Sequence, residues 1–245
     1  MSILETKKKL LNCLYDVFES FVAEKYQMAC KKGCHVCCTG DVVATTLEAD
    51  QVIKALKAAG REDLLEKLSA EIAADRFRPK VTTNTLAMAC LTRQEPPVEE
   101  PSPDPGICVF LENGECAVYE DRPFSCRGMY SLITCQAGGE AEAPPELVTI
   151  VTIIWQIIEH LDVGGLYGNL VDLIVTLADE KNAFQYANGE APRKKGIPPT
   201  KPVPGFLVPP DHQAAVQEFL GRLFQTECDG KNFRQAVAEA RNSPF

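Results

Sequence analysis

The sequence predicts a mainly α-helical protein with one small β-hairpin, a helical bundle-like scaffold around a cysteine metal site. Three observations lead to this prediction. Apolar residues recur at spacings of three and four in several segments, which is typical of amphipathic helices. One segment, around Asn113-Gly114, has the turn chemistry of a hairpin. Seven of the eleven cysteines fall in two short groups, a density that favours metal binding over ordinary packing.

Four helices are expected in the N-terminal part of the chain. Residues 3–28 carry a leucine and phenylalanine stripe with helical spacing. Residues 46–59 are followed by Gly60, which suits a helix C-terminus. Residues 62–77 repeat the pattern, and residues 81–92 have the composition of a further short helix.

The middle of the chain predicts a loop and then the hairpin. Residues 94–106 hold five prolines and four acidic residues, so we expect an extended, solvated loop. In the segment that follows, β-forming residues flank Asn113-Gly114, a pair that favours a type I′ turn. We therefore expect two antiparallel strands on either side of this turn.

The C-terminal part is predicted to be helical, with one long loop. The most apolar run, residues 147–158, is too short to span a membrane, which needs about twenty apolar residues. It predicts a buried helix opened by Pro144-Pro145. A second helix is expected at 166–179 and a proline-rich loop at 185–210. Two further helices are expected at 211–225 and 230–241.

Length and charge narrow the class of protein. We expect residues 1–245 to form a single cysteine-cluster metal-binding domain, since this length allows one sizeable core. The net charge of −9 argues against nucleic acid or an anionic membrane as a partner. Charged residues near the N-terminus interrupt any apolar run that a signal peptide would need, so we expect a cytoplasmic protein. Disulfides are rare there, and clustered cysteines more often bind metal.

The first cysteine group is the string CKKGCHVCC, which holds Cys30, Cys34, Cys37 and Cys38. On a helix the first three share one face, and in a loop Gly33 permits a tight chelating turn, so either geometry gathers three thiols. Cys38 is adjacent to Cys37, and neighbouring side chains are expected to diverge. It could bind a second metal, serve another edge of a cluster, or merely pack.

The second group consists of Cys108, Cys116 and Cys126, with Cys135 nine residues further on. The hairpin is expected to bring Cys108 and Cys116 together across its turn. We include Cys135 as a ligand or redox partner because it lies near the group in sequence. Nearby basic residues are expected to donate hydrogen bonds to sulfur: Lys31, Lys32, Arg122 and Arg127.

The remaining candidates are assigned simpler roles. Cys13, Cys90 and Cys228 are isolated in helical patterns and are expected to pack as small buried hydrophobic residues. His35 lies inside the first group but is more often a surface residue than a ligand in such a turn.

These two groups resemble the CxxCxxCC family of cysteine-cluster, zinc- or iron-chelating proteins. The first element of the family pattern matches at residues 30–38. The second element, a hairpin followed by Tyr-Glu-x-Arg-Pro and Cys-Arg, matches at residues 108–127. The resemblance covers some thirty positions, and the helical C-terminal half lies outside it. It implies metal binding. The flagellin lysine N-methylases, similar in this motif, are associated with an iron–sulfur cluster and S-adenosylmethionine.

The metal and its use stay open at this stage. Four thiolates suit zinc, and they suit an iron–sulfur cluster equally well. We expect a metal-binding protein that chelates zinc or iron, with an iron–sulfur cluster among the alternatives. A protein partner could dock on the helical scaffold, and a carrier or sensor that exchanges its ion is another alternative. A third is an iron–sulfur enzyme of redox or S-adenosylmethionine-dependent methyl-transfer type.

Overall fold

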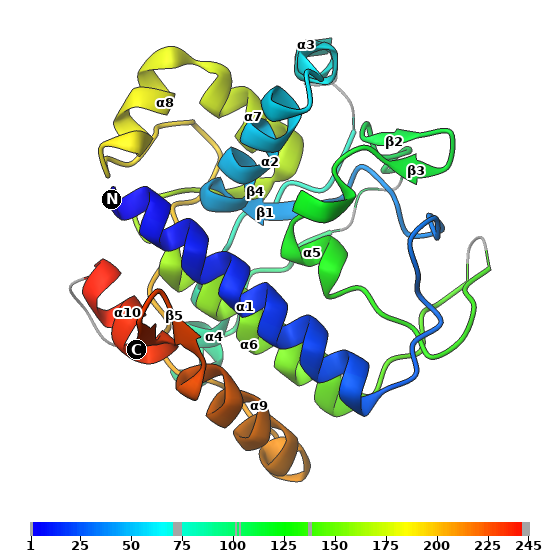
Figure 1. Cartoon of the computed structure of the whole chain (residues 1–245), viewed down its shortest axis with the longest axis vertical. Coiled ribbons are helices and arrows are strands. Elements are labelled where there is room, and N and C mark those ends of the chain that lie inside the picture. The colour runs from blue at the N-terminus through cyan, green and yellow to red at the C-terminus, as the bar shows by residue number, and fades with distance from the viewer. Residues whose placement is uncertain (1, 71–74, 101, 103, 137–138, 242–245) are drawn as a thin grey trace.

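The computed structural model describes residues 2–70, 75–100, 102, 104–136 and 139–241, and helices dominate these residues (Figure 1). The mainly α-helical prediction is confirmed. The helices are α1 Ile3–Lys25, α2 Thr46–Ala58, α3 Glu62–Ala70, α4 Thr83–Leu91, α5 Phe124–Arg127, α6 Pro145–Leu161, α7 Leu170–Ala178, α8 Glu180–Ala187, α9 Gln213–Gln225 and α10 Phe233–Arg241. The strands are β1 Val43–Thr45, β2 Leu111–Glu112, β3 Glu115–Cys116, β4 Tyr167–Asn169, β5 Glu227–Cys228 and β6 Lys231–Asn232.

A first hydrophobic core lies between α1, α6 and α9, which run alongside one another (Figure 1). The predicted stripe on α1 is buried here: Phe18 is 0% exposed and packs against Phe124 with ring centroids 5.1 Å apart. Ser2 caps α1 by accepting a hydrogen bond from the Glu5 amide. Pro145 opens the apolar helix α6, as expected. This core supports one side of the cysteine region described below.

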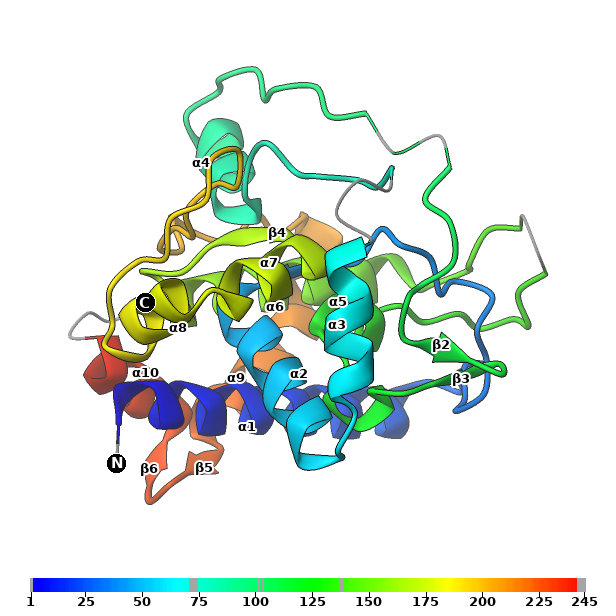
Figure 2. The same cartoon turned by 90° about the horizontal axis from the view of Figure 1, so that it is seen from above.

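A second core joins α2, α3 and α7 with the short sheet β1–β4 (Figure 2). The two strands are antiparallel, with Ala44 opposite Gly168. The sequence prediction missed this pairing and placed residues 167–169 inside a helix. Asn169 instead caps α7, which begins at Leu170, by accepting from the Val171 amide.

The C-terminal helices are tied to α1 by a disulfide between Cys13 and Cys228, whose Cα atoms are 6.3 Å apart. Cys228 belongs to β5 of the β5–β6 hairpin, which the sequence prediction also missed. The expectation that Cys13 and Cys228 merely pack is therefore wrong, because they are bonded to each other. The expectation for Cys90 is wrong too, since its thiol lies exposed on α4.

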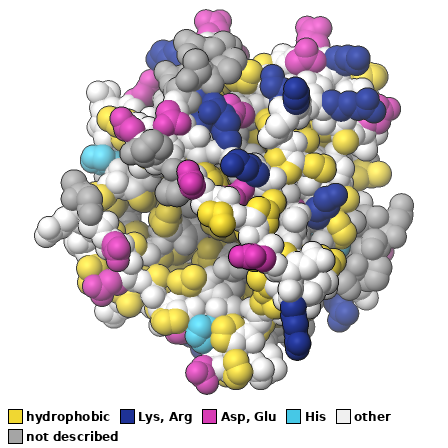
Figure 3. Space-filling model, turned by 180° about the vertical axis from the view of Figure 1, so that it is seen from behind, with side chains coloured by type: hydrophobic (Ala, Val, Ile, Leu, Met, Phe, Trp, Pro, Cys, Tyr) yellow, Lys and Arg dark blue, Asp and Glu magenta, His cyan; other side chains and the backbone are white. Residues whose placement is uncertain are grey.

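Several predicted boundaries shift in the structure. The helix expected at 62–77 is described only as Glu62–Ala70; residues 71–74 lie outside the described residues, and residues 75–80 are not helical. The loop expected at 185–210 begins later, because α8 extends to Ala187. Within the described part of the chain, no helix has both the length and the hydrophobicity of a membrane span. On the face seen in Figure 3, acidic and basic side chains are interspersed with apolar ones.

Candidate metal centre

The backbone joins the two cysteine groups directly. The Cys108 amide donates a hydrogen bond to the Cys38 carbonyl oxygen at 3.1 Å, and Thr39 and Ile107 form an antiparallel bridge beside it. The next residue, Gly40, donates its amide to the Pro105 carbonyl at 3.0 Å. A Cβ atom on Gly40 would lie 2.3 Å from that carbonyl oxygen, so only glycine allows this approach.

The first cysteine group forms a loop and not a helix, the two geometries that the sequence left open. The Cys34 amide donates to the Lys31 carbonyl, and the Cys38 amide donates to the His35 carbonyl, giving two consecutive turns. Gly33 has φ +88°, in the left-handed region that glycine adopts without strain. All four cysteines of this loop line the cavity described below.

The start of this loop is attached to the segment after α5. The Ser131 amide donates to the Cys30 sulfur at 3.2 Å, and the Ala29 amide donates to the Ser131 carbonyl at 2.8 Å. An N–H group directed at sulfur stabilises the thiolate form that binds metal.

The predicted hairpin is confirmed. Asn113 and Gly114 have φ values of 52° and 81°, as a type I′ turn requires. The pairing places Leu111, rather than Cys108, opposite Cys116, so the two cysteines are not cross-strand partners. The hairpin nevertheless brings them close enough for Cys116 to affect the Cys108 thiol electrostatically, and both line one cavity. The Leu111 amide donates to the Cys108 carbonyl oxygen at 3.0 Å.

The Tyr-Glu-x-Arg-Pro and Cys-Arg motif has a structural explanation in Arg127. Its guanidinium is buried and donates to the carbonyl oxygens of Arg122 (2.9 Å) and Glu120, which closes the turn before α5. It also pairs with the carboxylate of Glu19 on α1 at 2.5 Å. Arg127 therefore fixes the segment that carries Cys126 against the first core.

A cavity of about 370 Å³ lies between these segments, and seven of the eight predicted ligands line it. Other walls come from side chains that the sequence prediction did not connect with the site, notably Glu19 on α1, Tyr130 after α5 and Trp155 on α6. Cys135 does not line the cavity; it lies close enough to Cys30 to affect that thiol electrostatically. The seven lining cysteines are Cys30, Cys34, Cys37, Cys38, Cys108, Cys116 and Cys126.

The thiols border a cavity and are not gathered around a single ion position. Among the described residues, no three side chains of His, Cys, Asp or Glu converge closely enough to hold one metal ion. A tetrahedral zinc with Zn–S bonds of ~2.3 Å needs sulfurs only about 3.8 Å apart. The donor set is chemically right for thiolate-bound metal, since seven sulfurs line one cavity and the Ser131 amide donates to one of them.

The thiols differ in acidity. A hydrogen bond from the Cys38 thiol lowers the pKa of Cys37 to about 6, and the same contact raises the pKa of Cys38. Both adjacent cysteines line the same cavity. The surrounding protein atoms and the neighbouring thiols raise the pKa of Cys126 to about 12, although part of this residue is exposed to solvent. Burial also raises the pKa of Cys30 and Cys108. Metal binding would have to displace these protons.

In the part of the chain that the structure describes, Lys32, Arg122 and Arg127 donate hydrogen bonds to oxygen atoms and not to sulfur. Lys32 pairs with Glu120 at 3.1 Å and lies 5.2 Å from the centroid of the Tyr119 ring. Arg122 packs on that same ring at 3.9 Å and donates to the Tyr119 carbonyl. Arg122 nevertheless lines the cavity, and its charge favours the thiolate form of Cys116.

His35 is exposed and is not among the residues that line the cavity, in line with a surface role. Its Nδ1 atom lies 3.2 Å from the Gly33 carbonyl oxygen, so it helps to shape the turn.

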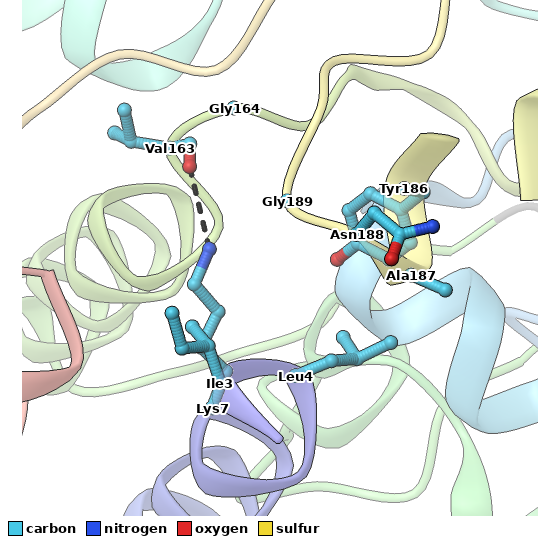
Figure 4. A pocket seen from close by; sticks show the side chains of 9 residues that line it. All are labelled: Ile3, Leu4, Lys7, Val163, Gly164, Tyr186, Ala187, Asn188 and Gly189. Carbon is cyan, nitrogen blue, oxygen red and sulfur yellow. Dashed lines mark hydrogen bonds between the residues drawn. The ribbon is translucent and has the colours of Figure 1, made fainter. Parts of the chain in front are cut away.

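A second cavity, of about 140 Å³, lies between the start of α1 and the end of α8 (Figure 4). No cysteine lines it. Lys7 donates to the Val163 carbonyl at 3.3 Å, and the remaining walls are apolar side chains, Asn188 and backbone. The convergence of thiols at the larger cavity makes that cavity the candidate site.

Comparison with known families agrees with this assignment. A family model named CxxCxxCC, described as a "Putative zinc- or iron-chelating domain", matches residues 29–142. This range contains both cysteine groups and Cys135, and covers somewhat under half of the chain. No curated protein and no solved structure matches the chain. Residues 29–142 are therefore similar to the zinc- or iron-chelating domain that this family model describes.

Proposed function

We propose that this protein binds zinc or iron through the thiolates of the seven cysteines that line the larger cavity. The observation that carries the proposal is their convergence: cysteines up to 96 positions apart in the sequence border a single space. The match to a zinc- or iron-chelating family supports the same function. Thiolates are preferred ligands of both metals.

The chain supplies groups that would stabilise bound metal. The Ser131 amide donates to the Cys30 sulfur, and backbone amides near Cys108 and Cys116 favour the thiolate forms of these two residues. Such hydrogen bonds orient ligands and reduce the charge on sulfur. Lys31 and Arg122 line the same cavity and offset part of the remaining negative charge.

The number of thiols favours a centre with more than one metal atom. Seven thiols border about 370 Å³, whereas one closed tetrahedral zinc site takes four ligands. We therefore propose a polynuclear centre, with an iron–sulfur cluster as one form of it. Cys135 is the eighth candidate ligand, and it would have to move toward Cys30 to take part.

An enzyme is the alternative function, of redox or S-adenosylmethionine-dependent methyl-transfer type. Its support is that Glu19, Tyr130 and Trp155 form walls of the cavity in addition to the sulfurs. A cavity with aromatic walls and a few polar groups beside a metal could accept a small molecule. Cys34 and Cys37 are also exposed, which leaves an approach to the centre.

The deciding experiment is to measure zinc, iron and acid-labile sulfide per chain in protein purified without oxygen. Iron with a matching amount of sulfide is expected for a cluster and would direct attention to the enzyme. Zinc at one or two ions per chain without sulfide would support a structural or exchangeable site. Protein that holds neither metal, even after incubation under reducing conditions with Zn²⁺, with Fe²⁺, or with Fe²⁺ and sulfide, would refute the proposal.

We also propose a cytoplasmic location, because nine cysteines are free and clustered free cysteines are typical of that compartment. The Cys13–Cys228 disulfide is unusual for that compartment and is the observation that opposes this proposal. The metal is the principal partner, and a protein partner for the helical scaffold stays a prediction.

A further inference from the structure

One buried carboxylate connects three helices beneath the cysteine cavity. Glu48, on the first turn of α2, is 4% exposed. Its Oε2 atom accepts hydrogen bonds from the amide and the hydroxyl of Thr45 at 2.8 and 3.1 Å. Its Oε1 atom accepts from the Tyr15 hydroxyl of α1 at 2.8 Å and from the Phe124 amide of α5 at 2.7 Å. Each oxygen therefore serves one backbone donor and one hydroxyl.

The bond to Phe124 is the one that reaches the cysteine region. Phe124 is the first residue of α5, and the preceding Pro123 offers no side-chain cap to this helix. The carboxylate of Glu48 supplies that cap from a different helix. Since α5 is a single turn, its orientation depends strongly on the group that holds its first amide.

The helix α5 carries residues of the candidate metal centre. Cys126, the third residue of α5, lines the cavity, and Arg127 is its last residue. The Arg127 guanidinium lies 4.6 Å from the centroid of the Tyr15 ring, and Phe124 stacks on the same ring at 6.0 Å. Glu48, Tyr15 and α5 thus form one packed unit, with the Cys126 thiol on its cavity side.

We propose that Glu48 is a positioning residue of the metal centre, which sets the place of the Cys126 thiolate through the Phe124 amide. This inference rests on the proposed metal-binding function. Glu48 lies outside both cysteine groups. An ordinary buried cap would stabilise the fold alone, whereas a positioning residue also changes how tightly the centre is held.

Asp162 provides a matched control. It is buried at the end of α6 and likewise accepts from a backbone amide, that of Leu47 at 3.1 Å, and from a tyrosine hydroxyl, that of Tyr186 at 2.6 Å. Neither partner belongs to a cysteine-bearing segment. Asp162→Asn therefore makes the same kind of change in a buried carboxylate without touching α5.

The experiment compares Glu48→Gln with Asp162→Asn and the wild type. A glutamine has one oxygen, so it can serve the Thr45 amide or the Phe124 amide, while its NH₂ group faces the other donor. Zn²⁺ and, without oxygen, Fe²⁺ are titrated separately against a chromophoric chelator, at a temperature where far-ultraviolet circular dichroism shows each apo-protein folded. We expect Glu48→Gln to lower metal affinity roughly 10- to 100-fold, the range typical of groups that orient ligands. Asp162→Asn is expected to leave the affinity within about threefold.

The outcomes separate the two proposals. Wild-type protein that binds neither metal refutes the metal-binding function itself. Wild-type binding with an unchanged affinity in folded Glu48→Gln refutes only the positioning role, as does an equal loss in Asp162→Asn. If Glu48→Gln does not fold, Glu48→Asp, whose shorter carboxylate cannot reach both donors, is measured in the same way. Failure of both variants to fold would make Glu48 a residue of the core alone and would overturn the inference.

Discussion

The amide of Cys108 donates a hydrogen bond to the carbonyl oxygen of Cys38 at 3.1 Å, although the two residues lie 70 positions apart in the sequence. The contact is made by the cysteines themselves, so the register between the two groups is fixed at the site. A shift by one residue would turn the neighbouring thiols away from the cavity.

Serine in place of one cysteine from either group should reduce the metal content. Cys34 lies in the first loop and Cys116 in the hairpin, and both line the cavity. We expect Cys34→Ser and Cys116→Ser each to lose at least half of the metal per chain. The stability that bound metal adds, about 4 kcal/mol at free metal 1,000 times Kd, should fall accordingly. Cys90→Ser is the control, because Cys90 is exposed on α4. Unchanged metal in both cavity variants would contradict a shared site.

Adding a methyl group at Gly40 should separate the two cysteine segments. The new Cβ atom would lie 2.3 Å from the Pro105 carbonyl oxygen, so the backbone has to move. We expect Gly40→Ala to lower the free energy of unfolding by about 1–3 kcal/mol and to reduce metal content. A Cβ atom at Gly221, in the middle of α9, would meet no other atom within 4 Å. Gly221→Ala is therefore expected to raise the free energy of unfolding by up to ~1 kcal/mol. Urea unfolding measures the stability of both variants. Equal stability of Gly40→Ala and Gly221→Ala would contradict the close approach of Gly40 to the Pro105 carbonyl oxygen.

Loss of the proton from Asp162 should lower the free energy of unfolding as the pH rises. Burial raises the pKa of this carboxyl to about 7 in the folded state, from an ordinary value of 3.8. Between about pH 4 and pH 7 the folded state therefore holds a proton that the unfolded state has lost. The free energy of unfolding should decrease with rising pH in this window, by at most ~1.4 kcal/mol per pH unit from this group.

The matching variant is Asp162→Asn, which does not titrate. The difference in stability between wild type and variant, measured by urea unfolding from pH 4 to pH 8, should change in that window and level off above about pH 7. Glu159, whose pKa burial raises to about 6, is present in both proteins and cancels in the difference. A difference that stays constant with pH would show that Asp162 does not titrate in this way.

Reduction of the Cys13–Cys228 disulfide should destabilise the fold. The bond joins residues 215 positions apart and restricts the unfolded chain. We expect a phosphine reductant or Cys228→Ser to lower the free energy of unfolding by about 2–5 kcal/mol. In Cys13→Ser the reductant should have no further effect, and the double variant should match either single one. An equal response to reductant in wild type and Cys13→Ser would place the sensitive thiols elsewhere.

The sequence predicted most helices because their packing repeats locally. The α1 stripe from Leu10 to Val22 is buried as its spacing requires, and Thr45 caps α2 through a capping box with Glu48. The β1–β4 pairing joins strands of three residues more than 100 positions apart, so no local pattern marks it. The helix α5 was also missed, since four residues are too few to show a helical period.

For the site, the cysteine spacing predicted that the two groups act together, and all seven of those thiols line one cavity. Their individual roles as ligands stay predictions. The sequence did not indicate that Glu19 or Glu48 contributes, because each lies in an amphipathic helix where a polar residue is ordinary. Their roles arise from contacts with α5 across the fold. The Cys13–Cys228 bond was missed for the same reason.

Trp155, which lines the cavity from α6, is the only tryptophan of the chain. Its indole emission therefore comes from one place, the wall of the cysteine cavity, with no background from other indoles. Thiolate-bound iron absorbs in the near ultraviolet and should quench this emission, whereas zinc, which has a filled d shell, should change it little. The protein thus contains an optical probe of which metal it holds, one that needs neither a label nor a substitution.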